Sequence, residues 1–211
     1  MKSVKYRPIQ KKDYVAVSKI LSKAFGLHGY VSDHKLLECF EMQYVYSCLS
    51  EATYTCIAEL DDEIIGVIMG NSKTDYNILS HLPYILKTFY YNRKMQHFKK
   101  NDAKGIEDYH KVHKMYHMFS KKHKNEFDGV LTLFAVSENC RGLGVGKRLL
   151  QELCNYLKEQ HTRRIYLYTD DTCNYSFYEH QGFERLEEGN LTLSKYGKSF
   201  LMKVFLYGYS L

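Results

Sequence analysis

Apolar residues recur along the first part of the chain with two different spacings. Where they return every three or four positions, the pattern predicts helices over residues 13–25 and 33–50. Runs rich in β-branched and aromatic residues predict strands over residues 4–9, 53–59 and 64–70. Because a short, mostly acidic link joins the last two of these strands, we expect them to form an antiparallel hairpin.

The last third of the chain begins with a continuous apolar run. Residues 130–136 predict a strand that is buried on both faces, and a glycine-rich turn and an amphipathic helix separate it from another strand at 164–169. A strand, a helix and a strand in this order form a βαβ unit, so the two strands should be parallel neighbours. A short helix over 174–181 and closing strands at 191–193 and 200–207 complete a predicted α/β fold.

Residues 72–125, between these two parts, differ in character. They predict two helices, 84–99 and 106–122, separated by a stretch with turn composition. The segment holds 12 Lys or Arg and 4 Asp or Glu, which gives it a formal charge of +8. The whole chain carries +6, so the remainder carries only −2. We interpret residues 1–211 as a single domain with a basic helical insertion between its third and fourth strands.

The overall composition is that of a soluble globular protein. Hydrophobic residues make up 45% of the 211 residues and charged residues 26%, which excludes wholesale disorder. No apolar run approaches the roughly 18 residues that cross a bilayer, and the basic N-terminal stretch has no signal-peptide core. The six cysteines form no C-x-x-C pair. We therefore expect a cytoplasmic protein with reduced thiols and no membrane partner.

The turn after the 130–136 strand reads R-G-L-G-V-G-K over residues 141–147. Glycines between a buried strand and a helix start leave backbone amides unpaired at the positive end of the helix dipole, and such a turn holds phosphate. A P-loop is excluded because Arg141 and Arg148 stand where that motif needs its first glycine and its hydroxyl. A dinucleotide-binding fingerprint fits poorly, because one residue rather than two separates the last two glycines.

A third kind of phosphate loop fits the turn. Arg141, Gly144 and Gly146 meet the pattern R/Q-x-x-G-x-G/A, and the turn thereby resembles the pyrophosphate loop of the GNAT-type N-acetyltransferases. Four further segments resemble that family in order and spacing: 7–25, 59–66, 174–183 and 200–206. The resemblance implies a GNAT acyl-CoA N-acyltransferase fold, with a mixed, twisted sheet of about six or seven strands flanked by helices. In that fold the parallel strands four and five splay apart, and here a helical hairpin would be inserted before them.

The same resemblance implies acetyl-CoA as cosubstrate and no metal. The pantetheine arm would pair with the backbone of the 130–136 strand, and the pyrophosphate would lie on the amides of the glycine-rich turn. An asparagine and a tyrosine of the 174–181 helix would complete the site. The implied cofactor-binding residues are Phe134, Ala135, Val136, Arg141, Gly142, Leu143, Gly144, Val145, Gly146, Lys147, Asn174 and Tyr178.

The resemblance also implies direct transfer of the acetyl group in a ternary complex. Tyr178 would act as the general acid that protonates the leaving thiolate, because it precedes the H-Q-G-F stretch as the family's tyrosine does. Its alternative role is packing, since the chain holds 20 tyrosines. A base must accept the amine proton, and Glu59 or Glu138 is the candidate on or beside a central strand. No cysteine lies in an obvious nucleophile setting.

The inserted segment raises separate questions. His110, His113 and His117 share one helix face, but lysines alternate with them as on a solvated side, so we expect no metal site. The acceptor is expected to be a small-molecule or peptide amine. The basic residues of the insertion would suit an acceptor that also carries a carboxylate or phosphate. The insertion is equally a candidate lid, or a homodimer contact through residues 89–91. Alternatives are a nucleic-acid-binding protein that uses the basic insertion on an acyl-CoA-binding scaffold, and a non-catalytic CoA sensor.

Overall fold

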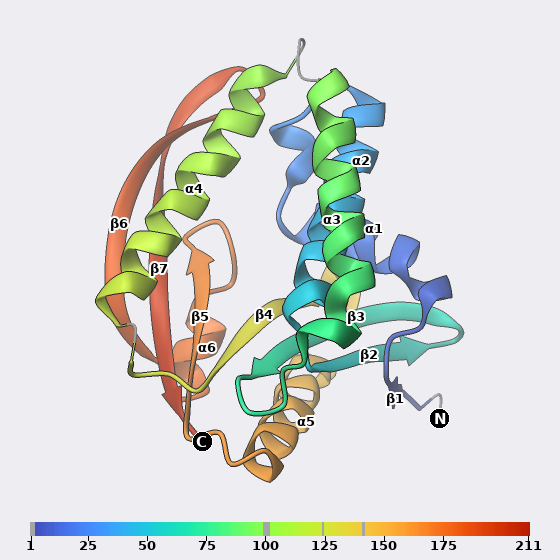
Figure 1. Ribbon diagram of the computed structural model, residues 1–211, viewed down its shortest axis with the longest axis vertical. Coiled ribbons are helices and arrows are strands. Elements are labelled where there is room, and N and C mark those ends of the chain that lie inside the picture. The colour runs from blue at the N-terminus through green and yellow to red at the C-terminus, as the bar shows by residue number, and fades with distance from the viewer. Residues whose placement is uncertain (1–2, 99–101, 124, 141) are drawn as a thin grey trace.

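The computed structural model describes residues 3–98, 102–123, 125–140 and 142–211. Within these residues a single mixed sheet has the strand order β1-β2-β3-β4-β5-β7-β6 (Figure 1). The pairing is antiparallel throughout except between β4 and β5, which are parallel. The strands are β1 (Lys5–Arg7), β2 (Tyr54–Leu60), β3 (Glu63–Ser72), β4 (Gly129–Val136), β5 (Arg164–Asp170), β6 (Glu184–Lys195) and β7 (Lys198–Ser210). The predicted hairpin and the predicted parallel pair are both confirmed.

Helices cover both faces of this sheet. On one face α1 and α2 pack on β3 and β4 around Val67, Leu133 and Ala135, whereas α5 packs on the opposite face around Ile65 and Ile68. The α-helices are α1 (Tyr14–Ala24), α2 (His34–Glu51), α3 (Ile78–Phe98), α4 (Ala103–Lys122), α5 (Val145–Glu159) and α6 (Ser176–His180). Short 3-10 turns occupy Lys11–Asp13, Leu27–Gly29 and Glu138–Cys140. The predicted α/β class and its flanked sheet are confirmed.

Strands β4 and β5 separate soon after they begin. They pair only at Gly129–Ile165 and Val130–Tyr166. On the other side of β4 the register with β3 shifts, since Gly70 pairs with Leu131 and Met69 with Leu133. Thr132 is therefore an extra residue on β4, and such a bulge bends its strand. The two parallel strands consequently splay apart toward their carboxyl ends, as the resemblance implied.

The two helices of the inserted segment pack on different halves of the molecule. Helix α3 lies against α2, whereas α4 lies along β6 and β7 (Figure 1). Their apolar sides explain this division: Tyr91 and Met95 of α3 join the core beneath α2, while Met115 and Phe119 of α4 join Val204 on β7. The expected helical hairpin is thus a pair of helices that diverge (Figure 1).

Helix α3 begins at Ile78, six residues before the start that Pro83 led us to predict. The side-chain oxygen of Asn77 accepts a hydrogen bond from the Leu79 amide at 3.0 Å, which caps the helix ahead of the proline. Proline removes only the one backbone bond that would reach back to Leu79. The capping hydrogen bond therefore compensates for the one backbone hydrogen bond that is lost, and Pro83 lies inside the helix.

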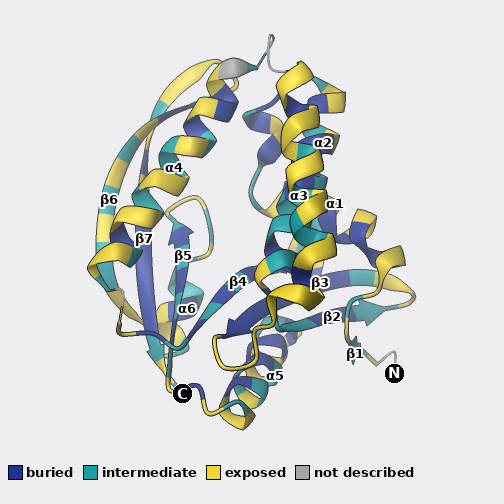
Figure 2. Ribbon diagram, viewed as in Figure 1, coloured by how far each residue is buried: buried dark blue, intermediate teal, exposed yellow. Residues whose placement is uncertain are grey.

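The closing strands are longer than their apolar cores predicted. Strand β6 carries E-R-L-E-E-G-N before its first buried position, and it is the edge strand of the sheet with one face open to solvent. Because such a strand holds many polar residues, its sequence lacks the clear alternation of apolar and polar positions that predicts a strand. Figure 2 shows the same contrast across the molecule, with central strands buried and the outer faces of α3 and α4 exposed. No helix among the described residues is long and apolar enough to cross a membrane.

Candidate active site

The splay leaves one edge of β4 without a strand partner. Phe134, Ala135 and Val136 pair with β3 on one side, but no described residue of β5 pairs with them on the other. Backbone amide and carbonyl groups that point toward this gap are available to an extended ligand, as at any open strand edge. The structure thus places the three predicted pantetheine-binding residues along a free strand edge.

The glycine-rich turn lies at the end of this edge. Gly142 and Gly144 have φ values of +83° and +72°, which other residues adopt only with strain, and a Cβ at either would meet nothing within 4 Å. Gly144 is the N-cap of α5, so the amides of Val145, Gly146 and Lys147 emerge from its first turn without helical partners. Arg141 lies outside the described residues.

The other predicted members of the turn have different surroundings. Leu143 is 60% exposed, and its amide donates to the Cys140 carbonyl at 3.4 Å. The Lys147 side chain is exposed beside the turn, whereas Arg148 Nη2 pairs with Glu152 Oε1 at 2.5 Å. The helix dipole, the open amides and Lys147 together give this turn a positive character that suits an anion.

Tyr178 of α6 is buried at 8% exposure and packs beside β4 and β7. Its ring centroid lies 6.2 Å from that of Phe134 on β4 and 6.2 Å from that of Tyr207 on β7. Burial raises the pKa of its hydroxyl, and Cys173 and Asp170 raise it further. The hydroxyl therefore keeps its proton at neutral pH, as a general acid must.

Asn174 lies in the turn before α6, not on the helix itself, because α6 begins at Ser176. The Ser176 hydroxyl donates to Asn174 Oδ1 at 3.0 Å, and the Phe177 amide donates to the Asn174 carbonyl at 3.2 Å. These bonds fix an exposed amide side chain at the mouth of the splay. Asn174 and Tyr178 are thus near each other along the chain, but one is exposed and the other buried.

The two predicted bases, Glu59 and Glu138, lie in different surroundings. Glu59 Oε2 accepts a hydrogen bond from Arg7 Nη2 at 2.6 Å and from Arg7 Nε at 3.1 Å. Arg7 also binds Asp13 at 2.6 Å, so Glu59 fastens β2 to the start of the chain. Glu138 lies in the exposed turn after β4, close in sequence to the glycine-rich turn. Neither position adjoins the fork where β4 and β5 separate, and the base role of both stays a prediction.

Sequence reasoning missed two residues beside that fork. The Cys48 thiol of α2 donates to the Thr132 carbonyl at 3.6 Å, and Glu51 follows one turn later as the last residue of α2. Thr132 Oγ1 is buried and has no hydrogen-bond partner among the described residues. Glu51 is reached by solvent, yet burial by the surrounding protein raises its pKa.

Tyrosines line the same space from α4 and β5. The rings of Tyr116 and Tyr168 stack at 4.2 Å, and the Tyr168 hydroxyl donates to the Tyr116 carbonyl at 2.9 Å. Burial raises the pKa of Tyr166, and the nearby Tyr168 and Glu51 raise it further. The end of α2 lies near this strand, because Asn71 binds the Glu51 carbonyl and pairs with Val130, which pairs with Tyr166. No sequence pattern could have joined Glu51 to these tyrosines, because helix packing alone makes them neighbours.

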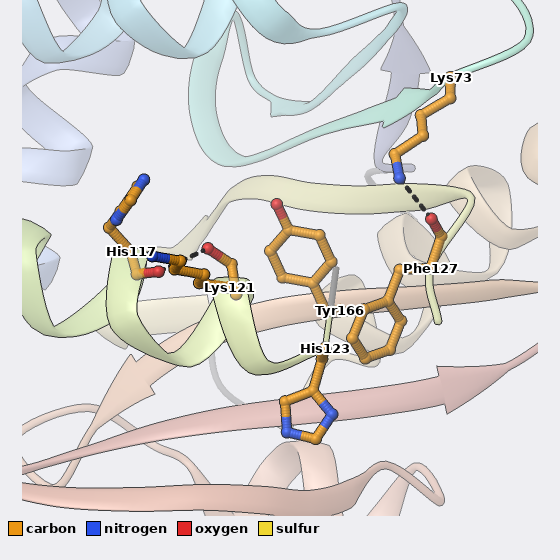
Figure 3. A pocket seen from close by; sticks show the side chains of 7 residues that line it. Lys73, His117, Lys121, His123, Phe127 and Tyr166 are labelled. Atoms are coloured by element: carbon orange, nitrogen blue, oxygen red, sulfur yellow. Dashed lines mark hydrogen bonds between the residues drawn. The ribbon is translucent and has the colours of Figure 1, made fainter. Parts of the chain in front are cut away.

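A cavity of about 380 Å³ opens beside Tyr166, between the end of α4 and the sheet (Figure 3). Its lining residues are Lys73, His117, Ser120, Lys121, His123, Phe127 and Tyr166. The histidines on α4 predicted to be solvated are exposed, as expected. Over the described part of the chain, no three His, Cys, Asp or Glu residues are grouped so that they could hold a metal ion.

Comparisons with known proteins bear on this arrangement. The model of the acetyltransferase (GNAT) family matches residues 16–183. No curated protein matches the chain. Similar solved structures include a ribosomal-protein-alanine N-acetyltransferase from Brucella melitensis, with a TM-score of 0.56, 14% identity and coverage of 98% of this chain and 99% of that one.

Two further structures share the fold. An N-acetyltransferase from Staphylococcus aureus Mu50 has a TM-score of 0.56 and 14% identity, over 99% of this chain and 98% of that one. An agmatine N-acetyltransferase mutant in its apo form has a TM-score of 0.59 and 10% identity, over 99% of each chain. At these identities the structures show a common fold and nothing finer.

Proposed function

Because the chain belongs to the acetyltransferase (GNAT) family, we propose that it moves an acetyl group from acetyl-CoA to the primary amine of an acceptor. The observation that carries the proposal is the free edge of β4, which ends at a glycine-rich helix N-terminus and lies above the buried Tyr178. A strand edge and an anion cradle can hold the cosubstrate, and a protonated hydroxyl can protonate the leaving thiolate.

The residues present fit acetyl-CoA. Phe134, Ala135 and Val136 offer backbone groups to the amides of pantetheine, and the open space at Gly142 and Gly144 lets a pyrophosphate approach the turn. The predicted roles of Leu143, Val145, Gly146, Lys147 and Asn174 in cofactor binding are part of this proposal. Acetyl-CoA would supply the activated acetyl carbonyl, and the chain supplies position and protons.

The reaction forms a C–N bond and breaks a C–S bond. A neutral amine attacks the thioester carbonyl, and the departing thiolate takes the proton that Tyr178 holds on its hydroxyl. The proton that the nitrogen loses on becoming an amide returns to the tyrosine oxygen through solvent. We propose direct transfer, because burial raises the pKa of Cys154 to about 11 and that of Cys173 to about 12. Thiols of that kind are poor nucleophiles near neutral pH.

Two measurements test the proposal. Saturating acetyl-CoA should raise the melting temperature, because a ligand that binds only the native state stabilises it. Incubation with acetyl-CoA and a panel of small-molecule and peptide amines should release free thiol. No thermal shift at saturating acetyl-CoA would refute the proposal, and a shift without thiol release from any amine would favour a CoA sensor. The family assignment favours transfer over the nucleic-acid-binding alternative.

A further inference from the structure

The cavity beside Tyr166 adjoins the site where an acceptor would meet acetyl-CoA. Tyr166 pairs with Val130 at the last contact between β4 and β5, so it lies at the fork of the splay. Figure 3 shows its ring between Phe127 on one side and His117 and Lys121 on the other. The cavity and the fork therefore share one wall, and a small ligand in the cavity would reach toward the free edge of β4.

The cavity presents positive charge. Lys73 Nζ donates to the Phe127 carbonyl at 2.6 Å, and no described carboxylate forms an ion pair with it, although its charge helps to lower the pKa of Asp128. Lys121 and His117 have no carboxylate partner among the described residues. His123 differs, because Glu126 and Glu187 lie 2.8 and 3.1 Å from its ring nitrogens.

Of two adjacent lysines on α4, only one lines the cavity. Lys122 Nζ binds Glu187 Oε2 at 2.8 Å, and Lys122 does not line the cavity. Lys121, one residue earlier, does line it. Two lysines without ion-pair partners in a concave site of this size suit a carboxylate or a phosphate group.

Glu51, at the end of α2, supplies a carboxylate near the head of the fork. Its backbone carbonyl accepts a hydrogen bond from the Asn71 side chain at 2.5 Å, Asn71 pairs with Val130, and Val130 pairs with Tyr166. Its charge also raises the pKa of Tyr166 and Tyr168. No ion pair or side-chain hydrogen bond holds Glu51 among the described residues. A negative group beside aromatic rings attracts an ammonium ion, which a positive cavity would repel.

We propose that the acceptor is a primary amine that also carries an anionic group, bound with the anion in the Lys73–Lys121 cavity and the amine beside Glu51. This inference rests on the proposed function and names the substrate class of the same site. Glu51 takes one proton from the ammonium ion, and the neutral nitrogen attacks the acetyl carbonyl to form the C–N bond. As the C–S bond breaks, the thiolate takes the proton of the Tyr178 hydroxyl. The second nitrogen proton passes through water to the Tyr178 oxygen and restores it, and Glu51 releases its own proton to solvent.

Matched pairs of amines test this substrate class. The pairs are glycine, β-alanine and 4-aminobutyrate, each against its carboxamide, and phosphoethanolamine against ethanolamine. For at least one pair we expect kcat/KM to favour the anionic member by about tenfold, which corresponds to about 1.4 kcal/mol. The double variant Lys73→Gln/Lys121→Gln should lower this ratio toward one, and Lys122→Gln, the matched control, should leave it unchanged.

A separate variant tests the amine end. Glu51→Gln should lower kcat by about a hundredfold for both members of a pair, because general-base catalysis contributes on that order, and it should remove the acidic limb of the pH profile. If kcat and the acidic limb are unchanged, Glu51 is not beside the amine. A purely structural role would change the melting temperature and leave the pH profile in place.

Four results would overturn the inference. They are equal kcat/KM for both members of every pair, a preference that survives the double variant, an equal loss in Lys122→Gln, and no turnover of any pair by a protein that acetyl-CoA stabilises. Failure of acetyl-CoA to stabilise the protein would instead refute the proposed function itself. The two failures are therefore distinguishable.

Discussion

Asp108 fastens α4 to the edge of the sheet, and its removal should release the wall of the proposed acceptor cavity. The side chain is 1% exposed. Its Oδ2 accepts a hydrogen bond from the Ser194 amide of β6 at 2.6 Å, and its Oδ1 accepts one from Lys111 at 2.9 Å. Asp108→Ala would leave the Ser194 amide buried without a partner, since Ser194 is only 8% exposed.

The expected cost follows from those contacts. A buried donor left without its partner costs about 1–3 kcal/mol, and the Lys111 contact adds little because that lysine is partly solvated. We expect Asp108→Ala to lower the free energy of unfolding by about 2 kcal/mol. In a protein of this size that corresponds to a fall in melting temperature of about 4–8 °C.

The neighbouring Glu107→Ala is the matched control. Glu107 is 66% exposed and pairs with the same lysine at 3.0 Å, so its removal should shift the melting temperature by less than about 1 °C. Thermal unfolding followed by circular dichroism measures both variants. Equal shifts in the two variants, or no shift in Asp108→Ala, would show that the buried bond to β6 does not anchor α4.

Three further predictions address the cofactor site and the N-terminal ion pairs. Tyr178→Phe should lower kcat at least tenfold with little change in acetyl-CoA affinity, and unchanged turnover in the thiol-release assay would exclude it as the acid. Gly144→Ala and Gly197→Ala place a Cβ at φ values of +72° and +74°, so each should cost about 1 kcal/mol in thermal unfolding. Only the former should weaken acetyl-CoA binding measured by calorimetry, and equal binding by both would remove that turn from the cofactor site. The Arg7 guanidinium lowers the pKa of Asp13, so the stability that this pair contributes is present above the usual aspartate pKa of 3.8 and is lost as the pH falls through the lowered value. Asp13→Asn should flatten that acid loss in urea titrations at pH 2–5, and an unchanged slope would contradict the assignment.

The sequence predicted the parts of the site that one local segment encodes. The buried run of β4, the glycine-rich turn and the helix after it follow each other without interruption, so their order alone implies a parallel pair with a phosphate-binding turn at its end. How far β4 and β5 separate could not be predicted from this segment, because the bulge at Thr132 depends on the register between β3 and β4. The first part of strand β6, residues 184–190, escaped prediction for a different reason, since an edge strand tolerates polar residues.

The acceptor side could not be predicted, because tertiary packing alone brings its members together. Glu51 ends one helix, Tyr166 lies on a strand more than a hundred residues later, and Lys121 belongs to a helix that the chain inserts between them. Their adjacency depends on α2 packing against β4 and on α4 packing along β6 and β7. The sequence pointed to Glu59 or Glu138 as the base, and the Arg7 partner of Glu59 comes from strand pairing at the other end of the sheet.

The net charge of the inserted segment is therefore a weak guide to what it binds. Lys87, Arg93 and Lys94 lie exposed on α3, which packs against α2 on the half of the molecule away from the cavity. Lys121 and its neighbour Lys122 lie on α4, and only the first faces the cavity. The charge that would select an acceptor is thus a small part of the +8, and helix packing determines which part it is. A variant that neutralises the exposed lysines of α3 should change the isoelectric point and leave the preference between paired amines intact, whereas a change in that preference would make the field of the whole segment, not the cavity, the source of selectivity.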